Sequence, residues 1–127
     1  MKIHHIGIAC EDIDLAIDEF KRYHEIVSQS DIVFDEMQNA KLCLVHTTTG
    51  LDVEFIAGSQ VQRLVKKGIS FYHVCYEVED MDKVMNAYIS NGALLISDIK
   101  PAILFQNRQV AFLQTSYGLV ELLEKGC

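Results

Sequence analysis

The stretch Gly118-Leu119-Val120-Glu121-Leu122-Leu123 decides how the rest of the sequence is interpreted. It has the composition of a β-strand, with a single carboxylate among Leu and Val. A near-copy, Leu51-Asp52-Val53-Glu54-Phe55-Ile56, again sets one Glu in an apolar run. Each copy follows a strand-like segment with one His, because His5 lies 49 residues before Glu54 and His73 lies 48 residues before Glu121. Two His and two Glu therefore recur in the same order.

The segments between these positions repeat as well. Asp12 is the expected N-cap of a helix that ends around 23–26, and the same pattern returns 68 residues later, where Asn91-Gly92 is a typical helix stop. The apolar positions at helical spacing are Ile13, Ala16, Ile17 and Phe20, then Met81, Val84, Met85 and Tyr88. Strands are expected at 30–35, 41–46 and 51–57, and again at 94–97, 110–114 and 119–124. The order βαβββ occurs twice.

This order predicts an α+β fold in which two βαβββ modules form a cupped mixed sheet. We expect module one at residues 1–57, a linker with a short helix at 58–69, and module two at 70–127. In the first strand, alternation places His5, Gly7 and Ala9 on one face and Ile6 and Ile8 on the other. Small residues beside a His leave room for another group to approach.

Composition narrows the function classes. The chain has 127 residues, half of them hydrophobic, which is enough for a core and argues against disorder. A net charge of −7 argues against nucleic acid or an anionic membrane as the main partner. The sequence shows neither a membrane-spanning run nor a signal-peptide pattern, so a cytoplasmic protein is expected. The four Cys are scattered without a C-x-x-C pair, which favours free thiols over a disulfide framework.

The repeated His and Glu residues predict a metal centre. Equivalent strands of two modules can each bring one His and one Glu to a shared point, which gives the set His5, Glu54, His73 and Glu121. Such a set can hold one six-coordinate divalent ion such as Co, Ni, Mn or Zn, with two positions left for substrate. A single His or Glu on a strand is more often a hydrogen-bonded or solvent-facing group. The recurrence of all four positions in register favours the metal.

The other polar candidates have simpler interpretations. His4 is expected at the surface or against a helix, His24 near a helix C-terminus and His46 in a structural role beside a turn. Lys66-Lys67 is expected to be a solvated pair. Four further residues lie on or beside the middle strands and are candidates for lining a cavity: Gln38, Arg108, Gln109 and Gln114.

The sequence resembles the vicinal oxygen chelate superfamily, which includes glyoxalase I, methylmalonyl-CoA epimerase, extradiol dioxygenases and antibiotic-resistance proteins. The similarity lies in segments 5–17 (His5-Ile6-Gly7-Ile8-Ala9 and beyond), 72–80 (with Tyr72-His73-Val74) and 110–122 (with Val110-Ala111-Phe112-Leu113). It implies a single vicinal oxygen chelate domain over 1–127, with paired βαβββ modules around a metal and usually a homodimer. The ligand positions of the family fall on His5, Glu54, His73 and Glu121, and the modules that build one site can belong to one chain or to two.

Within that superfamily, the sequence looks closest to methylmalonyl-CoA epimerases. The resemblance implies a metal-dependent isomerase or lyase that abstracts a proton next to a carbonyl of a small carbonyl compound or acyl thioester. Glu121 and Glu54 are then the candidate catalytic carboxylates. The sequence departs from the epimerases at Leu42, where these enzymes place a catalytic Glu on the third strand of the first module. Glu36 is offset from this position, so the second base has no clear candidate.

Two alternatives remain open. Glyoxalase I moves its proton with the metal-bound glutamates themselves, and both equivalents, Glu54 and Glu121, are present. Against it, Ala9 stands where bacterial glyoxalases carry an Arg for glutathione, and their Asp-Pro turn is replaced at 114–117. The second alternative is a non-catalytic protein of the same fold that binds a small molecule.

Overall fold

The computed structural model describes residues 1–126, which form two compact units. One unit consists of His5–Tyr72, and the other consists of Met1–His4 together with the described residues from His73 onward. The first strand, β1 (Lys2–Ala9), and the sixth, β6 (Phe71–Val78), each contribute residues to both units. The repeated βαβββ order and the α+β class are confirmed. Among the described residues, none of the helices is both long and apolar enough to cross a membrane.

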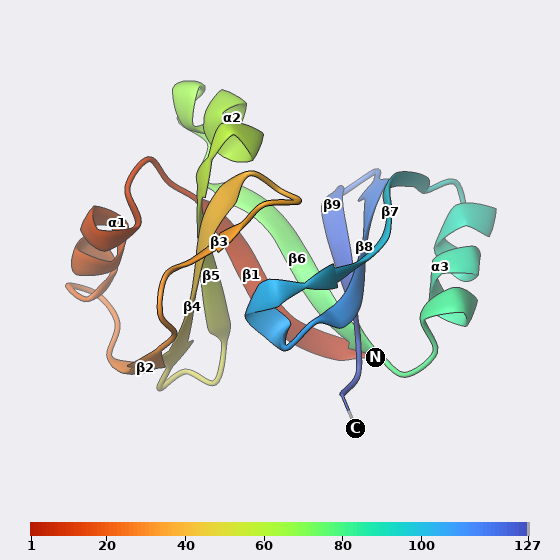
Figure 1. Cartoon of the computed structure of the whole chain (residues 1–127), viewed down its shortest axis with the longest axis horizontal. Coiled ribbons are helices and arrows are strands. Elements are labelled where there is room, and N and C mark those ends of the chain that lie inside the picture. Colours follow the sequence, from red (N-terminus) through yellow and green to blue (C-terminus); the bar gives the residue numbers. More distant parts are fainter. Residues whose placement is uncertain (127) are drawn as a thin grey trace. The chain divides into compact units, whose positions relative to one another are not determined.

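The unit His5–Tyr72 is a small mixed sheet with one helix on it (Figure 1). After β1 come α1 (Ile13–Phe20), β2 (Ile26–Gln29), β3 (Val33–Asp35), β4 (Ala40–Thr47) and β5 (Asp52–Gly58). The strand order is β2-β4-β5-β1, and β3 pairs with β4 beside β2. β5 is parallel to β1 and antiparallel to β4. A 3-10 turn, η1 (Ser59–Val61), and α2 (Gln62–Lys66) then form the short helical segment expected at 58–69.

The second unit repeats this plan. β6 is followed by α3 (Met81–Ser90), β7 (Leu94–Ala102), a 3-10 turn η2 (Ile103–Phe105), β8 (Arg108–Thr115) and β9 (Gly118–Glu124). The strand order is β6-β9-β8-β7, with β6 parallel to β9 and the remaining pairs antiparallel. The parallel pair in each unit joins the His strand to the Glu strand.

The two helices begin in the same way because their caps are equivalent. Asp12 Oδ1 accepts a hydrogen bond from the Leu15 N–H at 3.0 Å, and Asp80 Oδ1 accepts one from the Lys83 N–H at 3.1 Å. Each bond satisfies one of the N–H groups that a first helical turn leaves unpaired. The N-cap predicted at Asp12 is confirmed.

Each helix covers one face of its own sheet (Figure 1). Under α1 lies the apolar set Ile13, Ile17, Cys43, Val45, Val53, Phe55 and Ala57. Under α3 lies the apolar set Val78, Met81, Ala111, Leu113, Val120 and Leu122. Since side chains alternate along a strand, the residues between these positions point to the opposite face. His5 and Glu54 in one unit, and His73 and Glu121 in the other, are among them.

Three expected boundaries are wrong. The strand expected at 30–35 begins only at Val33, as β3, and a separate strand, β2, precedes it at Ile26–Gln29. Bonds between Ser30 and the backbone of Leu44, at 2.8 and 2.9 Å, lie at the break between β2 and β3. The first helix ends at Phe20, since the N–H groups of Tyr23 and His24 bond back to the Phe20 carbonyl in a turn. β7 continues to Ala102, past two irregularities in its register with β8.

Candidate functional site

The unit His5–Tyr72 buries one His–Glu pair. His5 on β1 and Glu54 on β5 are 0% and 4% exposed. Their strands are hydrogen-bonded in parallel, with Gly7 opposite Glu54 and His5 opposite Asp52. His5 Nε2 lies 3.7 Å from Glu54 Oε1. The pair occupies the face of the sheet away from α1.

The second unit buries an equivalent pair. His73 on β6 and Glu121 on β9 are 1% and 2% exposed. His73 Nε2 lies 3.1 Å from Glu121 Oε1. The Phe112 ring packs edge-on against the His73 imidazole with 5.5 Å between centroids, and Phe112 is also the β8 residue opposite Glu121. Residues on three adjacent strands thus fix this pair on the face away from α3.

The chemistry and spacing of each pair fit a divalent metal. Imidazole nitrogen and carboxylate oxygen bind such ions at about 2.0–2.2 Å, which puts two neighbouring ligand atoms about 3.0–3.4 Å apart. The observed distances of 3.1 and 3.7 Å are at or just above that spacing. A plain hydrogen bond also explains the 3.1 Å distance in isolation. It does not explain why the same buried pair occupies equivalent strands in both units.

The site face of the first unit continues onto β4. Leu42 and Leu44 lie opposite Ile56 and Glu54 in the β4–β5 ladder, so their side chains share the face of Glu54. Leu42 is 2% exposed. The position at which the epimerase resemblance calls for a base is therefore an aliphatic part of the same surface as the candidate ligand.

The remaining histidines have local partners. His46 Nδ1 lies 2.8 Å from Asp52 Oδ1 in a partly exposed pair between the end of β4 and the start of β5, in keeping with the expected structural role. His24 stacks on Phe20 with 4.5 Å between ring centroids. His4 is half-buried, and its ring meets Phe105 of η2 edge-on.

The four candidate cavity-lining residues lie in different parts of the structure. Arg108 and Gln114 lie on the same face of β8 as Phe112, whereas alternation puts Gln109 on the other face. Arg108 Nη1 donates to Glu77 Oε2 at 3.0 Å. Gln38 lies in a turn, where its side-chain amide donates to Asp35.

Cys10 and Cys43 are thiols with little nucleophilic character. Cys43 and Cys75 are buried, and Cys10 is half-buried. Burial, followed by the charge of Asp12, raises the pKa of Cys10 to about 11, and burial also raises the pKa of Cys43. Because the thiolate is the reactive form, neither residue is a candidate for thiol catalysis at neutral pH.

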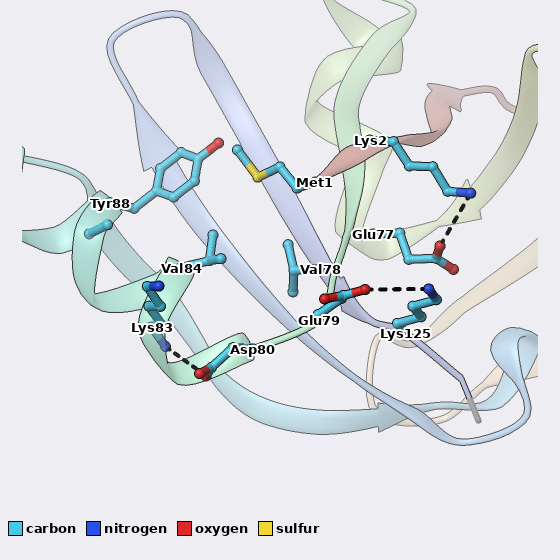
Figure 2. A pocket seen from close by; sticks show the side chains of 11 residues that line it. Met1, Lys2, Glu77, Val78, Glu79, Asp80, Lys83, Val84, Tyr88 and Lys125 are labelled. Atoms are coloured by element: carbon cyan, nitrogen blue, oxygen red, sulfur yellow. Dashed lines mark hydrogen bonds and ion pairs between the residues drawn. The ribbon is translucent and has the colours of Figure 1, made fainter.

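Sequence reasoning missed one feature, a cavity beside the first turn of α3 (Figure 2). Its charged lining residues, among them Lys2, Lys83 and Lys125, come from distant parts of the chain. Each looks like an ordinary solvated lysine in the sequence. Only Lys83 carried a signal, because a lysine is unusual in the first turn of a helix.

Comparison with known proteins gives a family profile and a set of similar folds. The profile described as the glyoxalase/bleomycin resistance protein/dioxygenase superfamily matches residues 4–112. No curated protein sequence matches the chain. The methylmalonyl-CoA epimerase of Mycobacterium tuberculosis superposes with a TM-score of 0.83 at 19% identity, over 99% of this chain and 89% of that one. A hypothetical protein of Bacillus halodurans superposes with a TM-score of 0.79 at 22% identity, over 99% and 95%.

A third similar structure carries a ligand. It is a glutamate-to-leucine variant of the Streptomyces coelicolor methylmalonyl-CoA epimerase in complex with 2-nitronate-propionyl-CoA. It superposes with a TM-score of 0.74 at 20% identity, over 100% of this chain and 96% of that one. At these identities the structural likeness establishes the fold.

Proposed function

Because the chain belongs to the glyoxalase/bleomycin resistance protein/dioxygenase superfamily, we propose that it is a metal-dependent isomerase or lyase that removes a proton next to a carbonyl. The activity that fits best is that of a methylmalonyl-CoA epimerase. One observation carries the proposal: a buried His–Glu pair lies on equivalent strands of both units, on the face opposite α1 in one unit and opposite α3 in the other.

In this proposal, His5, Glu54, His73 and Glu121 together hold one divalent ion, either Co, Ni, Mn or Zn. The two carboxylates balance the charge of the ion, so the substrate meets a nearly neutral centre. Such an ion, when bound, supplies a Lewis acid that stabilises the negative charge of an enolate oxygen. Two His and two Glu leave two of six positions for substrate oxygens.

The carboxylates of the chain handle the proton. Glu121 takes it from one face of the carbon next to the carbonyl, and a second acid on the opposite face gives a proton back, which inverts the carbon. Glu54 is the second candidate, since it is equally buried. The imidazoles of His73 and His5 lie beside these carboxylates, with Nε2–Oε1 distances of 3.1 and 3.7 Å.

A small carbonyl compound or an acyl thioester is the proposed substrate class. Support comes from the fold, which the methylmalonyl-CoA epimerases of two bacteria share, and from the thioester analogue bound to one of them. We further propose a homodimer. The apolar side chains of Leu94 and Ile96 on the edge strand β7 are 67% and 57% exposed, which supports an interface there. Sedimentation equilibrium giving the single-chain mass of 14.4 kDa would contradict the dimer.

Two other functions remain candidates. A glyoxalase I-like enzyme is favoured by the absence of a base at Leu42, because it needs only the two ligand carboxylates, Glu54 and Glu121. Ala9, which is 5% exposed, supplies no cation for a glutathione carboxylate. A non-catalytic binding protein would retain its ligand after the metal is removed.

The metal centre is tested by the metal content of protein purified without added metal or chelator. We expect about one divalent ion per chain in the wild type, and loss of that ion in His5→Ala and in His73→Ala with the fold retained. The matched control is His46→Ala, which removes the exposed His of another His–carboxylate pair on the same sheet and should keep the metal. Full metal content in His73→Ala would refute the site.

The reaction is tested by incubating the metal-loaded protein with methylmalonyl-CoA in D₂O and following deuterium at the carbon between the carbonyls by mass spectrometry. We expect metal-dependent exchange, and a larger loss of turnover than of metal in Glu121→Gln. Exchange at the wild-type rate in that variant removes Glu121 as the base. Isomerisation of the methylglyoxal–glutathione adduct without exchange of methylmalonyl-CoA would assign the glyoxalase alternative instead.

A further inference from the structure

A cavity lies away from the His73–Glu121 pair, within the unit that contains His73 (Figure 2). It has a volume of 710 Å³ and lies between the start of β1, the end of β6 and α3. One part of its wall is apolar, with Val78, Val84 and Tyr88. The other part is charged, and includes Lys2, Lys83 and Lys125. Neither His73 nor Glu121 lines it, so this groove, which we call the α3 groove, is separate from the candidate metal centre.

The internal repeat shows which part of the α3 groove the fold itself requires. A cavity of 660 Å³ occupies the equivalent place beside α1 in the other unit. Its lining residues are Cys10, Glu11, Asp12, Leu15, Ala16 and Glu19. Each of them lies 68 residues before a lining residue of the α3 groove: Val78, Glu79, Asp80, Lys83, Val84 and Ala87. The hollow is thus a product of the strand-to-helix connection, and any binding function must lie in the residues that differ.

The α3 groove and the cavity beside α1 differ in the charge of their lining residues. The cavity beside α1 is lined by three carboxylates, and none of its described lining residues is Lys or Arg. In the α3 groove, Lys83 replaces Leu15 and Ala87 replaces Glu19. Lys2 and Lys125 add two further ammonium groups. The groove therefore gathers cations in a chain whose net charge is −7.

The carboxylates of the α3 groove are already engaged. Glu77 pairs with Arg108 at 3.0 Å and with Lys2 at 3.8 Å. Glu79 pairs with Lys125 at 3.4 Å, and Asp80 caps the helix (Figure 2). Within residues 1–126, no carboxylate lies within ion-pair distance of the Lys83 ammonium.

Lys83 also occupies an unfavourable place for helix stability. It lies in the first turn of α3, where the helix dipole disfavours a cation. The equivalent residue of α1, Leu15, shows that the fold accepts an uncharged residue there. Lys83 is therefore not explained by the needs of the helix.

The apolar wall defines the rest of the ligand. Val78 and Val84 face the groove beside Tyr88 (Figure 2). Burial raises the pKa of Tyr88 above its ordinary value, so its ring presents a neutral phenol, which lies 3.4 Å from the Tyr117 hydroxyl. A volume of 710 Å³ is within the range of about 300–1,000 Å³ that is typical of small-molecule sites.

We propose that the α3 groove binds a small amphipathic anion, with a carboxylate or phosphate against Lys83 and an alkyl or aryl group along Val78, Val84 and Tyr88. The site is independent of the proposed enzymatic function, because it shares no residue with the candidate ligand set. The equivalent cavity beside α1, with its carboxylates, should reject the same molecules.

Isothermal titration calorimetry of the full chain with octanoate and with n-octyl phosphate tests the proposal. We expect saturable binding of at least one of the two anions at one site per chain, and no binding of octylamine. Tighter binding of octanoate assigns a carboxylate head group, and tighter binding of octyl phosphate assigns a phosphate. The proposal is overturned if octanol binds as tightly as the two anions do. It is also overturned if neither anion shows saturable binding.

Two variants introduce the residue that the other module carries at the equivalent position. Because the same fold accepts that residue there, the variants should remain folded. Lys83→Leu introduces the residue of the equivalent position in α1 and should weaken anion binding by about fivefold or more. Ala87→Glu introduces the equivalent carboxylate and should weaken it similarly. Lys66→Leu makes the same charge change on α2 in the other unit and should leave the affinity unchanged. Equal affinities for Lys83→Leu and the wild type would overturn the assignment.

Discussion

Replacing Glu77 by Gln is expected to destabilise the unit that carries His73. Glu77 lies on β6, two residues beyond Cys75 and on the same face as His73, and Arg108 on β8 reaches it across β9. The side chains of Glu77 and Arg108 keep only 14% and 21% of their exposed area. A hydrogen bond to a charged group contributes about 1.5–3 kcal/mol when shielded from water. Because Gln can still accept a weaker bond, we expect a loss of about 1–2 kcal/mol in the free energy of unfolding.

The pH dependence of this loss follows from the pKa of Glu77. Burial alone would raise the pKa of Glu77, but the hydrogen bond from Arg108 and the neighbouring cations outweigh it and lower the pKa below its ordinary value. A lowered carboxyl pKa in the folded state stabilises the protein at pH values above the unfolded pKa of about 4.3. That stabilisation disappears as the pH falls through the folded pKa, because Glu77 is then neutral like Gln.

Urea unfolding of the wild type and Glu77→Gln, followed by circular dichroism at several pH values, measures the difference. At pH 7 we expect the variant to unfold at a urea concentration about 0.5–1 M lower, and the gap should close as the pH falls below about 4. The matched control is Glu79→Gln, whose carboxylate is 84% exposed beside Lys125 and should change stability by less than about 0.5 kcal/mol. A gap that is the same at pH 7 and at acid pH would refute the ionic explanation.

Two further substitutions test the site and the backbone. Leu42→Glu places a carboxylate on the face of Glu54, where the resemblance calls for a base, and should raise deuterium exchange of methylmalonyl-CoA at least about tenfold. An unchanged rate in folded protein would contradict the placement of a base at position 42. Gly58→Ala should cost about 2–3 kcal/mol, because its backbone has φ +150° and the new Cβ would lie 2.6 Å from the Asn39 carbonyl oxygen. The control is Gly50→Ala, where the added Cβ meets no atom within 4 Å. Its melting temperature should fall less than that of Gly58→Ala. Equal falls in melting temperature would show that the contact with Asn39 is unimportant.

The sequence predicted the repeated fold because its strongest signals are local and occur twice. The sequence signals for the helices are short. The N-caps at Asp12 and Asp80, and the apolar residues at helical spacing, can each be recognised within one or two helical turns of sequence. The alternation in the first strand also placed His5 on the correct face. The pairing of each His with a Glu could be predicted from the order of the strands alone, and the internal repeat indicated that order. The proposed assembly of both pairs around one ion stays a prediction.

The parts that the sequence did not predict depend on long-range contacts. The break between β2 and β3 is set by bonds from Ser30 to Leu44, fourteen residues away. The length of β7 depends on its pairing with β8, which tolerates two irregularities and a proline, Pro101. The α3 groove combines Lys2 with Lys125 at the opposite end of the chain. No window of sequence contains such information.

The repeat also bears on the choice between the candidate reactions. Leu42 lies opposite Ile56, two residues beyond Glu54, and in the other unit Val110 lies opposite Leu123, two residues beyond Glu121. Both modules thus carry an aliphatic residue at this position, and in the first module it is where the epimerase resemblance calls for the additional base. Under the proposed function, the proton transfer then uses Glu54 and Glu121 themselves, which are also the proposed metal ligands. A reaction that one or two ligand carboxylates can complete, such as transfer between adjacent carbons, is favoured if Leu42→Glu proves necessary for exchange of methylmalonyl-CoA.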